Sequence, residues 1–126
     1  MFIRLAPVTV LAVGFLFLAG CTAKLNQSKS YSVQPDAAQG FYLPAQPKPQ
    51  KINIDFKADN DVTVLLFKAD DAKTDDEAIL KPEKQALGFQ KGKSGTFSVD
   101  VPENTETRLV IRGAQKTTKV DVKVTN

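Results

Sequence analysis

The chain has no histidine, no tryptophan and a single cysteine among its 126 residues. Without histidine there is no Ser-His-Asp or Cys-His catalytic centre, no imidazole metal ligand and no histidine pH switch. One cysteine excludes a disulfide within the chain and a zinc site built from several cysteines. The composition therefore argues against an enzyme, and it predicts neither a cofactor nor a metal site.

The only long apolar run is too short to cross a bilayer. From Leu5 to Ala19 the chain carries no charged side chain, and Arg4 is the one charge before that run. A membrane-spanning helix needs roughly 20 apolar residues, whereas this run has 15. A basic start, a short apolar core and small residues at its end are typical of a secretory signal peptide. We therefore expect residues 1–20 to be a signal peptide.

The end of this segment, Leu18-Ala19-Gly20-Cys21, resembles the lipobox of bacterial lipoproteins. The resemblance implies that diacylglycerol is transferred to the Cys21 sulfur, that the chain is cleaved between Gly20 and Cys21, and that the new amino group is acylated. Two or three acyl chains anchor a protein stably in a membrane. We therefore expect a lipid-anchored protein of the bacterial cell envelope. The alternative is an ordinary signal peptide followed by an incidental cysteine.

The residue after the cysteine and the net charge bear on location and partners. In enterobacterial lipoproteins an Asp after the lipidated cysteine retains the protein at the inner membrane, so Thr22 favours the outer membrane if the organism has two membranes. The net charge is +3, and Arg4 contributes one of these charges. So small an excess on an exported chain predicts no nucleic-acid partner.

Residues 21–50 are predicted to be the lipidated N-terminus and a flexible tether. They are poor in aliphatic side chains, and the prolines between residues 44 and 49 favour extended polyproline geometry. Two apolar islands, around Tyr31 and around Phe41 and Tyr42, leave two alternatives. They are either short strands that dock on the domain or hydrophobic contact points in a disordered arm. Tyr31, Phe41 and Tyr42 are our candidates for contact with another surface.

Residues 51–126 are predicted to form an all-β domain, a small antiparallel β-sandwich of the jelly-roll or Ig-like type with six to eight strands. Residues 62–67 are apolar on both faces, which is typical of a central strand. Alternation of apolar and polar residues predicts further strands at 52–56, 96–101 and 118–125. Leu109 and Ile111, which would share one face, indicate another strand at 107–112. The lysines of the last strand are typical of an edge strand that must not pair with neighbours.

Turn-forming residues separate these strands. They predict turns at 58–61, 102–105 and 113–116, the last of which would close a hairpin, and a loop at 91–95. The exception to the β pattern lies between residues 69 and 95. There we expect one helical turn with Asp75 or Asp76 as its N-cap, and a short strand at 87–89.

Two segments are similar to strands of bacterial pre-peptidase C-terminal domains. DVTVLLFKADD, from Asp61 to Asp71, resembles the Asp-x-Asp-Leu-Tyr-Leu strand of that family, and the segment from Gly95 to Val124 resembles its closing strands. The resemblance implies a jelly-roll-like β-sandwich attached to a secreted protein. Some domains of that family bind polysaccharide or protein, and some bind calcium.

Clusters of charged residues are the remaining candidate binding sites. Oxygen-rich side chains at residues 59–61 and 70–76 are a possible calcium site, or simply solvated loops. A basic segment, from Arg108 to Lys123, either faces anionic lipid or an acidic partner, or protects a strand edge. We conclude that the sequence predicts a lipid-anchored, non-catalytic envelope protein whose β-sandwich serves scaffolding or protein interaction. The alternative is a glycan- or calcium-binding module. The expected partners are the membrane, through Cys21, and an envelope protein or polysaccharide.

Overall fold

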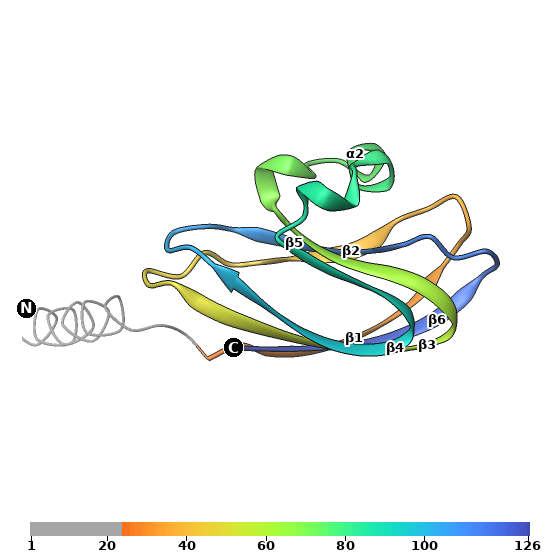
Figure 1. Cartoon of the computed structure of the whole chain (residues 1–126), viewed down its shortest axis with the longest axis horizontal. Coiled ribbons are helices and arrows are strands. Elements are labelled where there is room, and N and C mark those ends of the chain that lie inside the picture. Colours follow the sequence, from red (N-terminus) through yellow and green to blue (C-terminus); the bar gives the residue numbers. More distant parts are fainter. Residues whose placement is uncertain (1–23) are drawn as a thin grey trace, which may run out of the picture.

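The computed structural model describes residues 24–126, so the predicted signal peptide, its cleavage site at Gly20 and the lipidation site at Cys21 lie outside the described residues. The described residues form antiparallel strands, which confirms the predicted all-β sandwich (Figure 1). The strands are β1 (Asn26–Val33), β2 (Gln39–Leu43), β3 (Gln50–Lys68), β4 (Gly88–Val101), β5 (Thr107–Arg112) and β6 (Thr118–Thr125). Between β3 and β4 lie three short helical elements, η1 (Ala69–Asp71), α2 (Asp75–Leu80) and η2 (Glu83–Gln85).

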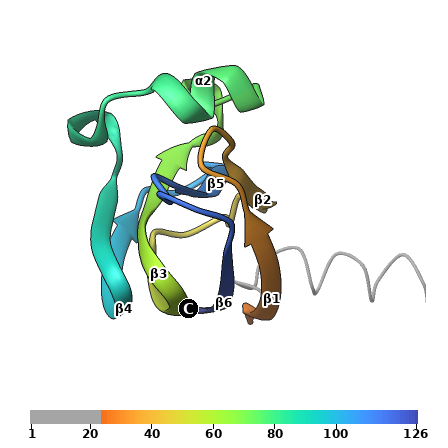
Figure 2. The same ribbon diagram turned by 90° about the vertical axis from the view of Figure 1, so that its right-hand side faces the viewer.

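Strand β3 is long enough to take part in both layers of the sandwich. Residues 53–58 pair with β6, and residues 63–68 pair with β5. Strand β4 pairs with β3 on the opposite side along both halves. The first layer therefore has the order β4, β3, β6, β1, as Figure 2 shows along its lower side, and the second layer has the order β4, β3, β5, β2.

Two predicted interruptions are absent, because the residues that signal a turn here bend a continuous strand. The turn expected at 58–61 lies inside β3, where the register with β4 shifts between Lys57 and Val62. The loop expected at 91–95 lies inside β4, and it includes Gly92 with a φ of 137°. Small and turn-forming residues are common at such bulges, where they let a sheet bend sharply.

Residues 24–50 differ most from expectation. Strand β1 pairs antiparallel with β6, from Asn26 opposite Thr125 to Val33 opposite Thr118, and β2 pairs in the same way with β5. The prediction of a flexible tether up to residue 50 is therefore wrong for both strands, and the alternative of docked strands is confirmed. Backbone hydrogen bonds supply much of this pairing, so few aliphatic side chains are needed to specify it.

The segment after β5 also departs from prediction. Residues 113–116 do not close a hairpin, because β5 and β6 lie in different layers and each pairs with another strand. Gly113, with a φ of 83°, begins the crossing between the layers. Strand β6 lies between β1 and β3, so the prediction that its lysines mark an edge strand is wrong.

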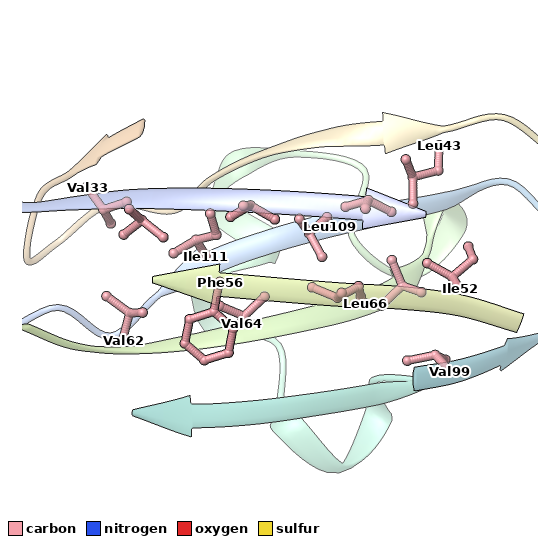
Figure 3. Close-up of a cluster of buried hydrophobic side chains, with 14 of the residues drawn as sticks. Val33, Leu43, Ile52, Phe56, Val62, Val64, Leu66, Val99, Leu109 and Ile111 are labelled. Atoms are coloured by element: carbon pink, nitrogen blue, oxygen red, sulfur yellow. The ribbon is translucent and has the colours of Figure 1, made fainter. Parts of the chain in front are cut away.

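The main hydrophobic core fills the space between the two layers. Alternate residues of each strand point inward, and Figure 3 shows their side chains interdigitated. Complete burial of such a side chain contributes about 1.5–3 kcal/mol. The labelled members are Val33, Leu43, Ile52, Phe56, Val62, Val64, Leu66, Val99, Leu109 and Ile111.

A smaller core lies on the outer face of the second layer, under the helical elements. Leu65, Phe67 and Val110 point outward there and are covered by Ala72 and Ala78. This confirms that residues 62–67 are apolar on both faces because both faces are buried. We call residues 69–86 the cap.

The predicted helical turn is present in the cap, but its N-cap is Thr74 and not Asp75 or Asp76. The helix spans Asp75–Leu80, and the Thr74 Oγ1 accepts a hydrogen bond from the Glu77 backbone N–H. Pro82 follows the helix end, as expected of a residue that disfavours helix before it. Within residues 24–126 no helix is long and apolar enough to cross a membrane.

Candidate functional site

The outer face of the first layer has no cap and carries a shallow groove of about 550 Å³. The central parts of β1, β6, β3 and β4 line it, and their outward side chains are polar because the apolar ones alternate toward the core. We call this surface the polar groove. The charged and hydroxyl-bearing residues that line it are Ser28, Lys29, Ser30, Asp55, Lys57, Ser94, Thr96, Asp121 and Lys123.

The strand register arranges four charges of the polar groove in alternation. Asp121 on β6 lies opposite Lys57 on β3, and Lys123 lies opposite Asp55 in the neighbouring row. Each strand therefore carries one acid and one lysine, with the order reversed between the two strands. Cross-strand neighbours of opposite charge stabilise a sheet modestly, by about 0.2–1 kcal/mol for each pair.

Hydroxyl groups on the outer two strands hold the two carboxylates in place. Ser30 Oγ donates to Asp121 Oδ1 at 2.5 Å, and Thr96 Oγ1 donates to Asp55 Oδ1 at 2.5 Å. The ion pairs among the described residues lie elsewhere, at Lys91–Glu83 and Arg108–Asp75. The Lys57 and Lys123 ammonium groups thus keep their donors for a ligand, beside two oriented acceptors.

A second groove extends this surface toward the bend of β3. It has a volume of about 470 Å³ and shares Ser30, Lys57 and Asp121 with the polar groove. Asp59 and Lys119 add a further acid and a further base at its far side. The two hollows together form one open trough that suits an extended polar ligand better than a small enclosed one.

Two of the three predicted contact residues lie between the layers. The rings of Tyr31 and Phe41 stack with their centroids 6.3 Å apart, and both pack against the main core. Lys29 Nζ lies 5.6 Å from the centre of the Phe41 ring. Burial raises the pKa of the Tyr31 hydroxyl. These aromatic side chains close the gap between β1 and β2, and their contact with another surface stays a prediction.

The third predicted contact residue, Tyr42, is 47% exposed on the second layer. Its hydroxyl donates to the Lys73 backbone oxygen at 3.1 Å, and the Arg108 guanidinium lies 5.4 Å from its ring centre. Tyr42 therefore joins β2 to the cap, and the structure does not bring it together with the polar groove.

Two arginines of the predicted basic segment hold the cap. Arg108 Nη1 donates to the Ala72 oxygen at 2.9 Å. Arg112 Nη1 donates to the Ala78 and Ile79 oxygens at 2.7 and 3.1 Å, near the end of α2. Burial lowers the pKa of Arg112, and the charge of Glu83 opposes that shift. Neither guanidinium is therefore free to face anionic lipid or an acidic partner.

The sequence predicted neither the polar groove nor the contacts of Arg108 and Arg112 with the cap. The alternation of Arg108 and Arg112 with inward Leu109 and Ile111 was a signal, because it places both arginines on the face that the cap covers. The polar groove left no such signal, since its four strands come from distant parts of the chain.

The acidic residues do not assemble into a metal site. Among residues 24–126 no three acidic or cysteine side chains come close enough to hold a metal ion. The acidic residues of this part of the chain therefore give no support to the calcium alternative.

Comparisons with known proteins support the fold. The structure is similar to the pre-peptidase C-terminal domain of a Bacillus anthracis collagenase, with a TM-score of 0.56 and 11% identity over 79% of this chain and 89% of that domain. It also matches PliG, a periplasmic inhibitor of g-type lysozyme from Aeromonas hydrophila, with a TM-score of 0.45 and 11% identity over 82% of this chain and 87% of that one. No protein-family model and no curated sequence matches the chain. At 11% identity, the likeness to the collagenase domain is one of fold.

Proposed function

We propose that this is a lipid-anchored, non-catalytic protein of the bacterial cell envelope that binds another envelope component through the polar groove. The anchor rests on the resemblance of Leu18-Ala19-Gly20-Cys21 to a lipobox. The polar groove is the observation that carries the binding role. It combines two unpaired ammonium groups and two oriented carboxylates on an uncovered sheet face.

The openness of the polar groove favours binding over catalysis. Catalytic groups act most strongly where water is excluded and charges are poorly screened. Asp55 and Asp121 instead lie on an exposed strand face, each with a hydroxyl donor beside it. The absence of histidine from the sequence removes the commonest general base as well.

A polysaccharide is the partner that this chemistry fits best, and an envelope protein is the second candidate. A saccharide chain offers many hydroxyl groups, which donate to carboxylates and accept from ammonium groups. Protein contacts usually centre on exposed aromatic or arginine side chains. The charged and hydroxyl side chains of the polar groove include neither type.

Binding is tested by co-sedimentation of the mature protein, released in detergent, with isolated envelopes before and after digestion by protease. We expect Lys57→Ala/Lys123→Ala to weaken retention severalfold. The matched control Lys68→Ala/Lys84→Ala, which removes two exposed lysines outside the polar groove, should retain binding. Equal retention of both variants contradicts the assignment of the polar groove. Loss of binding after protease digestion identifies a protein partner instead of a polysaccharide.

The anchor is tested by replacing Cys21 with Ser. The expected result is an uncleaved precursor without the mass of a diacylglycerol group, measured by mass spectrometry of the purified protein. Normal maturation and membrane attachment of this variant would overturn the lipoprotein assignment.

A further inference from the structure

The folded domain begins only four residues after Cys21. Leu25 is 6% exposed and packs in the main core. Its backbone N–H donates to Asn126 Oδ1 at 2.8 Å, and Asn126 Nδ2 donates to Gln50 Oε1 at 3.0 Å. The chain is thus fixed to the domain at Leu25, by side-chain burial and by a hydrogen bond.

So short a connection limits how far the domain can move from a lipid attached to Cys21. A fully extended chain spans at most about 3.3–3.6 Å per residue, so the step from Cys21 to Leu25 covers no more than about 14 Å. A tether of thirty residues in polyproline geometry, at about 3.1 Å per residue, would have reached about 90 Å. Because β1 and β2 dock on the domain, the connection between Cys21 and the folded domain is short, in contrast to the long tether expected from the sequence.

Leu25 lies at a defined end of the sandwich. Asn26 and Asn53 both lie opposite Thr125, beside the C-terminus. Two loops, residues 44–49 and 102–106, are joined at this end by a hydrogen bond from the Asn104 N–H to the Gln46 oxygen at 2.7 Å. Figure 1 shows these loops and the C-terminus toward the same side of the molecule. We call residues 24–25, 44–49, 102–106 and 126 the anchor end.

We propose that the anchor end rests on the lipid headgroups and that the opposite end, with residues 58–61 and 113–117, points away from the membrane. This inference rests on the proposed lipidation of Cys21. At about 3.4 Å per residue, the eight residues of β6 place the two ends roughly 27 Å apart. In this orientation the polar groove lies on the side of the domain, between the membrane and the opposite end. The second groove continues it toward that opposite end, away from the membrane.

Charge alone does not hold the anchor end on the membrane. Its exposed side chains include Lys24 and Lys48, but also Glu103 and Glu106. Such a balance gives no net attraction to an anionic surface, where each excess basic residue contributes about 1 kcal/mol. The acyl chains and the short connection therefore determine the orientation, and the unlipidated domain should not bind vesicles.

The test compares two labelled cysteines in the lipidated, full-length mature protein. Glu103→Cys carries a fluorophore at the anchor end, and Gln115→Cys carries it at the far end; both positions are exposed. The protein is inserted into phosphatidylglycerol–phosphatidylethanolamine vesicles that contain a headgroup-attached quencher. We expect quenching at residue 103 to exceed that at residue 115 severalfold. Equal quenching, or stronger quenching at residue 115, overturns the orientation.

A second variant separates the short connection from other causes. Twenty glycine and serine residues inserted between Ala23 and Lys24 should bring the quenching at residues 103 and 115 close together while lipidation is kept. Persistent preference for residue 103 would mean that the surface, rather than the connection, sets the orientation, and would overturn the inference as stated. Mass spectrometry is run on every sample. An absent acyl mass with no vesicle binding contradicts the lipidation itself, which is a different result from lipidated protein without preferential quenching.

Discussion

Arg108 on β5 and Asp75 at the start of α2 form an ion pair, with 2.6 Å between Nη2 and Oδ1, that ties the cap to the sandwich. The two partners differ in environment. The Arg108 side chain is 7% exposed, whereas that of Asp75 is 76% exposed. Most of the desolvation cost therefore falls on the guanidinium, which the Ala72 oxygen and the Tyr42 ring also stabilise.

This asymmetry predicts unequal effects of removing either partner. Arg108→Met should lower the free energy of unfolding by about 2–3 kcal/mol, because buried hydrogen bonds to a charged group are lost. Asp75→Asn should cost less than about 1 kcal/mol, since an exposed carboxylate contributes little to an ion pair. Urea unfolding of the two variants measures the difference. Equal losses of unfolding free energy would show that the exposed Asp75 carboxylate contributes as much stability as the buried contacts of Arg108.

The docking of β1 and β2 predicts that residues 51–126 do not fold alone. Removing residues 24–50 exposes one edge of β6 and one edge of β5, and it removes Leu25, Val33 and Leu43 from the core. Three lost side chains of this kind are worth about 4.5–9 kcal/mol, which is comparable to the whole stability of a small domain. The shorter fragment should give NMR spectra with poor amide dispersion.

The fragment 24–126 is the matched control for this experiment, because it keeps every strand. It should unfold cooperatively in urea. A well-dispersed spectrum from residues 51–126 would show that β1 and β2 are accessory strands and not part of the folding unit.

The docking of β1 and β2 shows which parts of the fold a local sequence pattern can predict and which it cannot. Residues 62–67 were predicted as a central strand because their apolar side chains fill both faces, and the cap supplies the second burial surface. The segment NQSKSYSV contributes only two apolar side chains to the core, Tyr31 and Val33, so its alternation is too short to distinguish it from a linker. Its position is set by pairing with residues almost a hundred positions later, which no local pattern encodes.

Turn signals were misleading for a related reason. Residues 58–61 and Gly92 are of types that are common in turns. The β3–β4 pairing nevertheless continues on both sides of them, so the chain bends there without ending the strand. The polar groove follows from this long-range register. Asp55 and Asp121 are ordinary surface acids in the sequence, and the β3–β6 pairing sets each opposite a lysine of the other strand.

The close approach of β2 to β5 predicts that Gly40 tolerates no side chain. A Cβ at this position would overlap the Leu109 backbone oxygen and lie 2.8 Å from its carbonyl carbon. Backbone atoms cannot move aside without displacing β5, so Gly40→Ala should destabilise the domain by about 1–3 kcal/mol. Gln39→Ala, one residue earlier on the same strand, should change the stability by less than about 0.5 kcal/mol. Thermal unfolding of the two variants tests the contrast, and equal midpoints would contradict the close approach.

The burial of Tyr31 predicts a stability that depends on alkaline pH. Burial raises the pKa of its hydroxyl above the ordinary value of 10.0, because the ionised form is poorly solvated there. The neutral form is thus favoured in the folded state. Its contribution to stability is fully present below the unfolded pKa and is lost as pH rises through the folded one. In a Tyr42→Phe background, where Tyr31 is the remaining tyrosine, ultraviolet absorbance should give a titration midpoint above that of the same protein in urea. Adding Tyr31→Phe should flatten the fall in unfolding free energy above pH 10, and an identical slope in both proteins would mean that the hydroxyl ionises as readily in the folded state as in the unfolded one.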